Sequence, residues 1–336
     1  MIINWRCFMK LLFDHMKTEY WDKKLKEIKD ENEDLEILFF DSDEDKRKKL
    51  KEADGLIGGF LTEEEIDIAK NLKIIFVPFS GVNTLPSEKL LERDIIVANS
   101  KGNGKVVAER AVSLTMSLLG KIPHFHNDMK KGVWHGFSVG EKPHQSWESI
   151  IDKKVTILGT GSIGKSLAKY LKAFDCEITG YKNSYNGEKI ENFDILTTDF
   201  EKAIEKAEIV YIALPLTNNT RDTINKDNIN LFKNKYIVNV GRGPIVNEEA
   251  LFIGIRDNIL KGAAIDVWYD YPTKDAMYKL PSKYPIHLYE NVILSPHVAG
   301  FNEKAIQYSV DWCIDNVRNY IQNGEPKNRV NMKLKY

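Results

Sequence analysis

Three glycines in the segment VTILGTGSIGKSLAKYL, Gly159, Gly161 and Gly164, have the spacing G-x-G-x-x-G. An apolar run precedes them and an amphipathic helical pattern follows. In that context the first glycine allows a tight turn, the second lets the backbone approach a pyrophosphate, and the third lets helix and strand pack closely. The helix start, with Ser162 and Ile163, offers unpaired N–H groups to phosphate. The motif predicts a dinucleotide site; the alternative is a glycine-rich turn that binds nothing.

The end of the next predicted strand bears on which dinucleotide fits. An acidic side chain at this place, roughly 20 residues after the motif, binds the ribose hydroxyls of NAD. The segment EITGYKNS instead puts Lys182 there, followed by Asn183 and Ser184. An ammonium flanked by an amide and a hydroxyl attracts a 2′-phosphate, which a carboxylate would repel. The sequence therefore favours NADP(H); the alternative is that Lys182 is only solvated and that NAD is also accepted.

Repeated βα units must position these residues. Helical segments separate most of the predicted strands, and each strand is a compact apolar run without the alternation of a half-exposed sheet. This pattern predicts an α/β protein with two doubly wound parallel-sheet domains that face a cleft. The predicted strands cover 35–40, 55–60, 73–79 and 94–99 in the first series, and 153–159, 176–181, 208–214, 236–240, 262–267 and 291–296 in the second.

Several helices have clear signals of their own. Thr62 and Glu65 form a capping box that opens a helix, the charged run 43–52 is the solvated face of another, and a long helix covers about 105–121. A terminal helix, from about residue 303 to 322, ends at the segment NGEP, whose glycine and proline stop it. Because the second series of strands is complete before it begins, we place this helix on the first domain.

Composition limits the class of protein. The chain has 336 residues, of which 43% are hydrophobic and 29% charged, with a net charge of -1, which suits two globular domains. The balanced charge gives no reason to expect nucleic acid or an anionic membrane as a partner, and no apolar run approaches the roughly 20 residues of a membrane span. Residues 1–8 look like a dispensable extension before Met9, without a secretion signal. Cys7, Cys176 and Cys313 lie far apart, which suits a reducing cytoplasm and argues against a zinc or disulfide framework.

The motifs in combination resemble one family. The segments GTGSIG, ALPLTNNTRDTI, NVGRGPIVNEEAL, GAAIDV and NVILSPHVAG, with FVPFSGVNTLP upstream and NGEP downstream, are similar to those of the D-isomer-specific 2-hydroxyacid dehydrogenases. The resemblance covers nearly everything after about residue 50. It implies a Rossmann cofactor domain, 102–302, inserted into a split flavodoxin-like substrate domain, 1–101 with 303–336. It also implies a homodimer that transfers hydride between NAD(P)H and a small 2-hydroxy or 2-oxo acid, as glyoxylate and hydroxypyruvate reductases do.

The resemblance assigns roles to individual residues. Arg242 matches the arginine that holds the substrate's carboxylate and carbonyl oxygen, a task that suits a planar fork of donors. His297 matches the proton donor to that oxygen, and imidazole changes charge near neutral pH. Asp266 matches the carboxylate that binds the nicotinamide carboxamide. Val240 and Gly241 match residues whose backbone contacts the nicotinamide ring, Pro215 matches the residue beside the adenosine half, and Gly300 matches a cofactor-binding position. Ser80, Gly81 and Val82 match the loop that receives the substrate carboxylate.

One catalytic position departs from the family. The family has a glutamate before the proline of its DVF-x-x-E-P motif, where it hydrogen-bonds the histidine; this chain has Tyr271 there, and Asp270 is one residue too early. The Tyr271 hydroxyl could orient His297 without a charge, which would raise the histidine's pKa less than a carboxylate does. Alternatively Asp270 swings in, or proton transfer is not needed, as in the related formate dehydrogenases. A further alternative is that Tyr269, Asp270 and Tyr271 only form part of the wall of the cleft.

Other features have weaker signals. We expect Trp268, Tyr269 and Tyr271 to narrow or line the substrate pocket. His124 and His126, in HFH, could chelate a metal, but no carboxylate or cysteine cluster supports a metal site, and we expect an exposed helix end. The segment 132–137, GVWHGF, resembles a packing and subunit-contact segment of the family's dimers.

A second class of function stays open. Some relatives of the family act as nucleotide-sensing corepressors, in which the bound cofactor sets assembly rather than turnover. Loss of the catalytic glutamate fits such a binding role. Retention of Arg242 and His297 argues for the enzyme, because a sensor needs neither residue.

Overall fold

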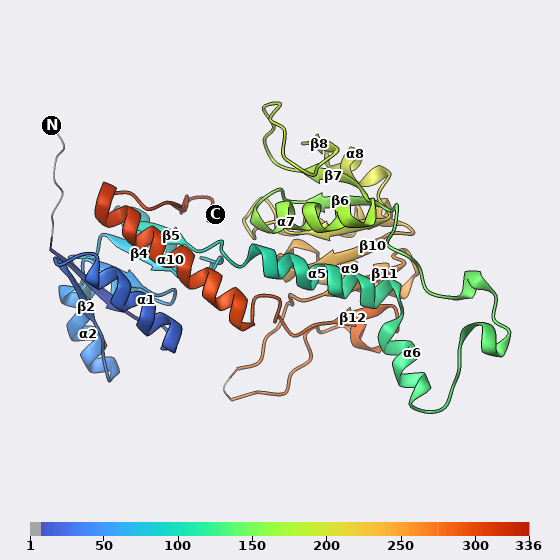
Figure 1. Ribbon diagram of the computed structural model, residues 1–336, viewed down its shortest axis with the longest axis horizontal. Coiled ribbons are helices and arrows are strands. Elements are labelled where there is room, and N and C mark those ends of the chain that lie inside the picture. Colours follow the sequence, from blue (N-terminus) through green and yellow to red (C-terminus); the bar gives the residue numbers. More distant parts are fainter. Residues whose placement is uncertain (1–7, 274, 336) are drawn as a thin grey trace. The chain divides into compact units, whose positions relative to one another are not determined.

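The protein was analysed as a computed structural model that describes residues 8–273 and 275–335 (Figure 1). The chain divides into two compact units. The first contains the residues up to Asn103 together with those from Glu303, and the second is Gly104–Asn302. Within the described ranges, every helix is too short or too polar to cross a membrane. The extension expected before Met9 lies almost wholly outside the described residues, as does Cys7.

The first unit is built on a five-stranded parallel sheet with the order β2-β1-β3-β4-β5. This order is that of flavodoxin-like folds, as expected. The strand next to the edge strand β2 was missed in the sequence, because MKLLF directly follows the opening segment that we interpreted as an extension. The strands are β1 (Met9–Phe13), β2 (Leu35–Leu38), β3 (Gly55–Ile57), β4 (Ile74–Val77) and β5 (Ile96–Asn99).

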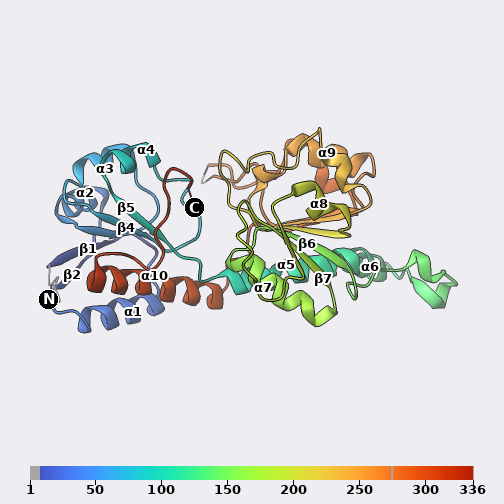
Figure 2. The same cartoon turned by 90° about the horizontal axis from the view of Figure 1, so that it is seen from above.

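Helices cover both faces of this sheet (Figure 2). Three lie on one face: α2 (Asp43–Glu52), α3 (Glu63–Ile68) and α4 (Ser87–Glu92). The other face carries α1 (Glu19–Asp30) and the terminal helix α10 (Glu303–Asn323).

Two predictions for these helices are confirmed. The capping box at the start of α3 is present, with Thr62 Oγ1 accepting from Glu65 N at 3.1 Å and Glu65 Oε2 accepting from Thr62 N at 2.9 Å. The terminal helix packs on the first sheet, because Cys313 and Val317 share a core with Trp21 of α1.

The second unit contains a seven-stranded parallel sheet with the order β12-β11-β10-β9-β6-β7-β8. Counted within the unit, this is the Rossmann order 3-2-1-4-5-6 with one further strand. The edge strand β8 was missed in the sequence, since it is only three residues long and partly exposed. The strands are β6 (Lys154–Leu158), β7 (Glu177–Tyr181), β8 (Ile195–Thr197), β9 (Ile209–Ile212), β10 (Tyr236–Asn239), β11 (Gly262–Ile265) and β12 (Val292–Leu294).

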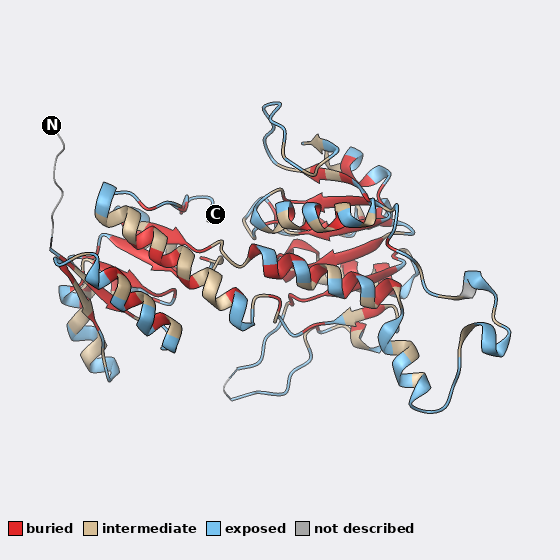
Figure 3. Cartoon of the chain, viewed as in Figure 1, coloured by how far each residue is buried: buried red, intermediate tan, exposed pale blue. Residues whose placement is uncertain are grey.

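Helices also cover both faces of the second sheet (Figure 2). On one face lie α5 (Gly104–Leu119) and α7 (Ser162–Leu171), and on the other α8 (Phe200–Glu205) and α9 (Glu248–Arg256). Figure 3 shows that the inner strands are buried, whereas α6 (Ile122–Met129) and the segment after it, with the short 3-10 helix η1 (Gly136–Val139), are largely exposed. Further 3-10 helices are η2 (Pro143–Gln145), η3 (Lys172–Phe174), η4 (Ile229–Phe232), η5 (Gly243–Ile245) and η6 (Ile286–Leu288).

Candidate active site

Five of the expected site residues of the second unit follow the carboxyl ends of five neighbouring strands. Gly159 follows β6, Pro215 follows β9, Arg242 follows β10, Asp266 follows β11 and His297 follows β12. Open α/β sheets bind ligands at this edge. The five strands also end in register, because their last residues pair in one row: Leu158, Ile212, Asn239, Ile265 and Leu294.

The glycine turn has the shape that a dinucleotide needs. Gly159 has a φ of 105°, a conformation that other residues rarely adopt, and a Cβ there would lie 2.7 Å from the Ala213 carbonyl oxygen. A Cβ at Gly164 would collide with the carbonyl oxygen of Gly159, so this glycine allows the close approach of α7 to β6. At Gly161 a Cβ would meet nothing within 4 Å. The space before the first turn of α7 is therefore open to a phosphate.

Arg242 lies in a turn that the buried Asn239 holds. The Asn239 amide donates to the Arg242 carbonyl and accepts from the Gly241 N–H, both at 3.1 Å. The half-buried guanidinium donates through Nη1 to the Gly241 carbonyl at 2.7 Å, its one hydrogen bond to a described residue. Burial lowers the pKa of Arg242 from its usual value, although arginine stays charged. A guanidinium with four N–H donors to spare is suited to a carboxylate.

Asp266 holds the loop that carries His297. The Asp266 carboxylate, which is 1% exposed, accepts from Val298 N at 3.1 Å, from Ala299 N at 3.0 Å and from the Ser295 hydroxyl. His297 itself has a φ of 56°, in the left-handed region that a non-glycine residue rarely occupies. Gly300, three residues further along the same loop, is half-buried. We expected Asp266 to bind the nicotinamide carboxamide; its contacts in the structure are to the loop backbone and to the Ser295 hydroxyl.

The Ser295 hydroxyl links this loop to α5. Arg110 Nη2 donates to Ser295 Oγ at 3.1 Å, and Ser295 in turn donates to Asp266. The Arg110 Nε is buried and has no hydrogen-bond partner among the described residues. Sequence reasoning missed both Arg110 and Ser295; their positions, within a helix and as the first residue of SPH, gave no separate signal.

The imidazole of His297 has no hydrogen bond to any residue that the structure describes. Desolvation and the nearby Arg242 guanidinium lower the pKa of His297 below its ordinary 6.5, and the Asp266 charge opposes this effect. The Tyr271 ring lies beside it, with 5.5 Å between ring centroids, but its hydroxyl accepts from Trp268 N at 3.0 Å. The Asp270 carboxylate pairs with Lys279 at 2.7 Å. Neither residue therefore replaces the family's glutamate as a hydrogen-bond partner of the histidine.

Two of the three aromatic residues expected to line the pocket lie in the core instead. Trp268 is 5% exposed and donates through Nε1 to the Ser295 carbonyl at 2.7 Å. The Tyr269 hydroxyl donates to the Val246 carbonyl at 2.9 Å, and burial raises the pKa of Tyr269. The expectation is wrong for these two residues, because both side chains pack against the core of the second unit and donate to backbone carbonyls there. Only Tyr271, which is 41% exposed, remains available.

Lys182 has a partner that the sequence did not reveal. Its ammonium hydrogen-bonds Glu188, and this contact, with the Asn186 N–H, lowers the pKa of Glu188 to about 2. Both side chains line a cavity of ≈ 580 Å³ beside α7, together with Lys165, Lys169 and Lys189. Asn183 and Ser184, expected to help bind the cofactor, are exposed. Glu188 lies six residues beyond the expected position, in a loop whose conformation the sequence does not indicate.

The expected carboxylate loop belongs to the first unit. Ser80, Gly81 and Val82 follow β4, and the loop is fixed by two hydrogen bonds to the end of β5. Ser80 Oγ donates to the Ser100 carbonyl at 2.9 Å, and Asn99 Nδ2 donates to the Ser80 carbonyl at 2.6 Å. Val82 is buried, whereas Ser80 and Gly81 are half-buried.

We expected no metal site at His124 and His126 because no carboxylate or cysteine cluster supported one, and this reason is wrong. His126 is exposed on α6, as expected, but His124 lies 3.5 Å from the carboxylate of Asp128, and His135 lies 3.0 Å from the same oxygen. The sequence did not reveal this cluster because His135 is separated from α6 by an irregular segment.

Known proteins with similar sequences are dehydrogenases and reductases. The chain is 28% identical over 311 residues to D-3-phosphoglycerate dehydrogenase of Methanocaldococcus jannaschii, a match that covers 91% of this chain and 57% of that protein. It is 29% identical over 280 residues to glyoxylate reductase of Thermofilum pendens, covering 81% of this chain and 78% of that protein. The chain thus spans little more than half the length of the first relative and most of the second.

Solved structures and a family model agree with these matches. A protein of Pyrococcus horikoshii superposes with a TM-score of 0.79 at 29% identity, over 96% of this chain and 95% of that one. An NADPH-dependent glyoxylate/hydroxypyruvate reductase of Sinorhizobium meliloti shares the fold, with a TM-score of 0.77 at 21% identity over 96% and 98% of the two chains. The NAD binding domain of the D-isomer specific 2-hydroxyacid dehydrogenases matches residues 112–299. The chain belongs to the D-isomer-specific 2-hydroxyacid dehydrogenase family, whose members are nicotinamide-dependent oxidoreductases.

Proposed function

We propose that this protein transfers hydride between a nicotinamide cofactor and a small 2-hydroxy or 2-oxo acid, in the manner of glyoxylate and hydroxypyruvate reductases. The observation that carries the proposal is the pair Arg242 and His297. Both follow strands that end in one row of the Rossmann sheet, and the guanidinium is close enough to lower the pKa of the imidazole. A guanidinium with free N–H donors beside a titratable ring suits an oxo acid, whose carboxylate needs a cationic partner and whose carbonyl oxygen needs a proton.

Each residue has a defined part in this proposal. Arg242 binds the substrate's carboxylate and carbonyl oxygen, and His297 exchanges the proton of that oxygen. The loop Ser80–Val82 of the first unit also contacts the carboxylate. The cofactor, when bound, supplies or accepts the hydride. Residues that would hold it are Gly159, Gly161, Ser162, Ile163, Gly164, Pro215, Val240, Gly241, Asp266 and Gly300.

We further propose that the enzyme prefers NADP(H) to NAD(H). Four lysines, Lys165, Lys169, Lys182 and Lys189, line the cavity beside the phosphate-binding helix, and an excess of positive charge favours a 2′-phosphate over a hydroxyl. Glu188 opposes the preference, because it neutralises Lys182 and could itself accept from ribose hydroxyls. The outcome depends on whether Lys182 exchanges Glu188 for the phosphate.

The proposal extends to organisation and location. The unit 104–302 is the cofactor domain, in line with the match at 112–299, and the remainder binds substrate. We expect a homodimer that covers the exposed apolar side chains of the segment after α6, among them Trp134 at 58% exposed and Phe137 at 90% exposed. The scattered cysteines favour the reducing cytoplasm.

The test is a steady-state assay of NADPH and NADH oxidation with glyoxylate, hydroxypyruvate, pyruvate and longer oxo acids. We expect saturable turnover with at least one of the short acids. Binding of the cofactor without turnover on any acid would contradict the proposal and favour a nucleotide-sensing protein of the corepressor type. The missing carboxylate beside His297 is the one observation that speaks for that alternative.

A further inference from the structure

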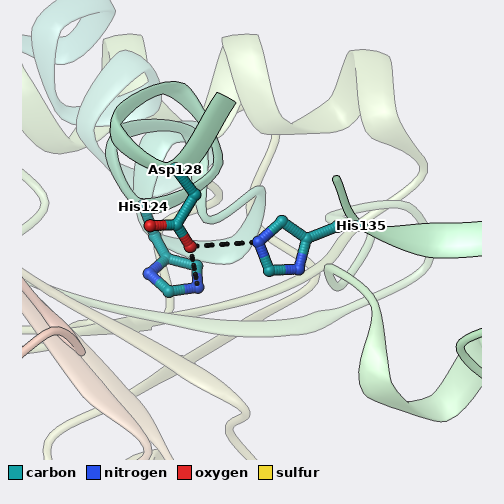
Figure 4. A group of neighbouring side chains, drawn as sticks. All are labelled: His124, Asp128 and His135. Atoms are coloured by element: carbon teal, nitrogen blue, oxygen red, sulfur yellow. Dashed lines mark hydrogen bonds and ion pairs between the residues drawn. The ribbon is translucent and has the colours of Figure 1, made fainter. Parts of the chain in front are cut away.

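Three side chains converge where α6 meets the segment that follows it (Figure 4). His124 and Asp128 are four residues apart on α6 and therefore share one face of the helix. His135 reaches them from beyond the end of the helix, just before η1. One potential ligand atom from each lies within 4.8 Å of the other two. The cluster is far along the chain from the residues assigned to hydride transfer, and the proposed reaction does not use it.

The orientation of both imidazoles suits a metal ion. The same oxygen of Asp128 faces Nε2 of His135 at 3.0 Å and Nε2 of His124 at 3.5 Å. The other nitrogen of each ring faces a second carboxylate: His135 Nδ1 lies 3.2 Å from Glu141, and His124 Nδ1 lies 3.7 Å from Glu290. Histidine ligands of metals commonly donate their second N–H to a carboxylate, which fixes the tautomer and directs the other nitrogen to the metal.

The outer carboxylate on His135 is itself held in place. Glu141 Oε2 accepts from the Gly136 N–H at 2.7 Å, while its other oxygen faces the ring. Glu290 is more exposed, at 83% of its side chain, and its contact is longer. The arrangement is therefore more rigid on the His135 side than on the His124 side.

The distances and donor atoms indicate the class of ion. Ligand atoms bound to tetrahedral Zn²⁺ at about 2.0–2.1 Å lie roughly 3.3 Å apart, close to the two spacings around Asp128. Two imidazole nitrogens and one carboxylate oxygen suit Zn²⁺ and similar transition metals, whereas Mg²⁺ and Ca²⁺ prefer oxygen ligands alone. Three protein ligands leave one position for water. His124, Asp128 and Glu290 also line an adjoining cavity of ≈ 480 Å³, which gives that position access to solvent.

We propose that His124, Asp128 and His135 bind one Zn²⁺-type ion, with Glu141 and Glu290 as outer carboxylates. The ion ties the face of α6 to the segment that leads into η1. That segment carries the exposed Trp134 and Phe137, so the ion restricts the freedom of an apolar surface. Lys131, whose ammonium lies 3.8 Å from the other oxygen of Asp128, is a cation paired with the cluster.

The test uses the full-length protein without an affinity tag, stripped with a chelator and titrated with Co²⁺. We expect the visible absorption bands of tetrahedral Co²⁺ to saturate at one ion per chain and to disappear when Zn²⁺ is added. His135→Ala and His124→Ala should each weaken binding far more than tenfold, and Glu141→Gln by about tenfold, as outer carboxylates usually do. His126→Ala is the matched control, since it removes a histidine of the same helix that lies outside the cluster.

A second measurement separates binding from misfolding. Far-ultraviolet circular dichroism should show every variant folded, because the three ligands are all partly exposed. Zn²⁺, but not Mg²⁺, should slow proteolysis within residues 130–141 of the wild-type chain and not of His135→Ala. Absence of saturable Co²⁺ bands, or bands that survive His135→Ala, would overturn the site. Neither readout needs substrate or cofactor, so the result is independent of the proposed activity.

Discussion

The carboxylate of Asp266 accepts hydrogen bonds from the backbone immediately after His297, from Val298 N at 3.1 Å and from Ala299 N at 3.0 Å. A buried aspartate that follows β11 thus holds the loop in which His297, after β12, has a left-handed backbone conformation. The backbone geometry of the proposed proton donor depends on an acid that does not hydrogen-bond its ring. This relationship makes Asp266 a positioning residue for His297 in addition to any contact with the cofactor.

Asp266→Asn should therefore impair both stability and turnover. The amide can present only one acceptor oxygen, so at least one buried N–H of the loop loses its partner, at a cost of roughly 1–3 kcal/mol in the free energy of unfolding. We expect a lower Tm and a fall in kcat of more than about tenfold. Ser295→Ala, which removes one contact and keeps the carboxylate, should show a smaller effect on both. Wild-type kcat and Tm in Asp266→Asn would refute the positioning role.

The dependence of kcat/KM on pH should show the effect of the missing glutamate. Reduction needs protonated His297, and the pKa of His297 lies below 6.5 because of desolvation and Arg242. As the pH rises through that lowered pKa the proton is lost, so kcat/KM for reduction should decline already below pH 6.5. Oxidation of the hydroxy acid needs the neutral ring and should decline as the pH falls through the same pKa.

Tyr271→Glu, which returns the family's glutamate to this position, should raise the pH at which kcat/KM for reduction declines. A carboxylate beside the imidazole stabilises its charged form, and an opposite charge at such a distance shifts a pKa by about 1–3 units. The alkaline limb of the reductive profile should move upward accordingly. Tyr271→Phe, which removes the hydroxyl but adds no charge, should leave the limb in place. A limb that does not move in Tyr271→Glu would show that His297 does not set it.

Cofactor preference should respond in opposite directions to the two partners of one ion pair. Lys182→Ala removes the cation for a 2′-phosphate and should lower the ratio of kcat/KM for NADPH over NADH by about tenfold or more, the size of one charge-assisted hydrogen bond. Glu188→Gln frees Lys182 from its partner and should raise the ratio. A change in the same direction for both variants would contradict the proposed subsite.

The glycine turn offers a pair of alanine substitutions with different outcomes. Gly164→Ala places a Cβ against the Gly159 carbonyl and should destabilise the fold by about 1–3 kcal/mol, seen as a lower Tm without cofactor. Gly161→Ala meets open space in the protein, so its Tm should be unchanged while the Kd of the cofactor rises. If both variants lose stability equally, Gly161 does not face a ligand site.

The sequence predicts the parts of this molecule that depend on short, local patterns. Apolar runs located ten of the strands, and Thr62 with Glu65 marked a helix start correctly, because capping needs only neighbours. The strand Met9–Phe13 was missed because a run of five residues at the start of a chain has no preceding element to define it. Motif positions placed Arg242 and His297 after strands, and Asp266 at the end of one, for the same local reason.

The remainder depends on contacts that no local pattern encodes. The pairing of Lys182 with Glu188 is made by a loop without periodicity. The direction of the Tyr271 hydroxyl, toward Trp268 N, follows from the packing of neighbouring aromatic residues in the core. His135 meets Asp128 only because the chain turns back after α6. In each case the partner is fixed by tertiary structure rather than by spacing.

The central claim is that Arg242 and His297 act together on an oxo acid beside the cofactor. The most direct measurement is kcat/KM for glyoxylate or hydroxypyruvate in His297→Gln, with binding of NADPH followed separately by its fluorescence. We predict a loss of about 10²–10⁴-fold in kcat/KM, the usual contribution of a general acid, with the Kd of NADPH unchanged. Turnover at the wild-type rate in this variant, with the cofactor still bound, would contradict the account.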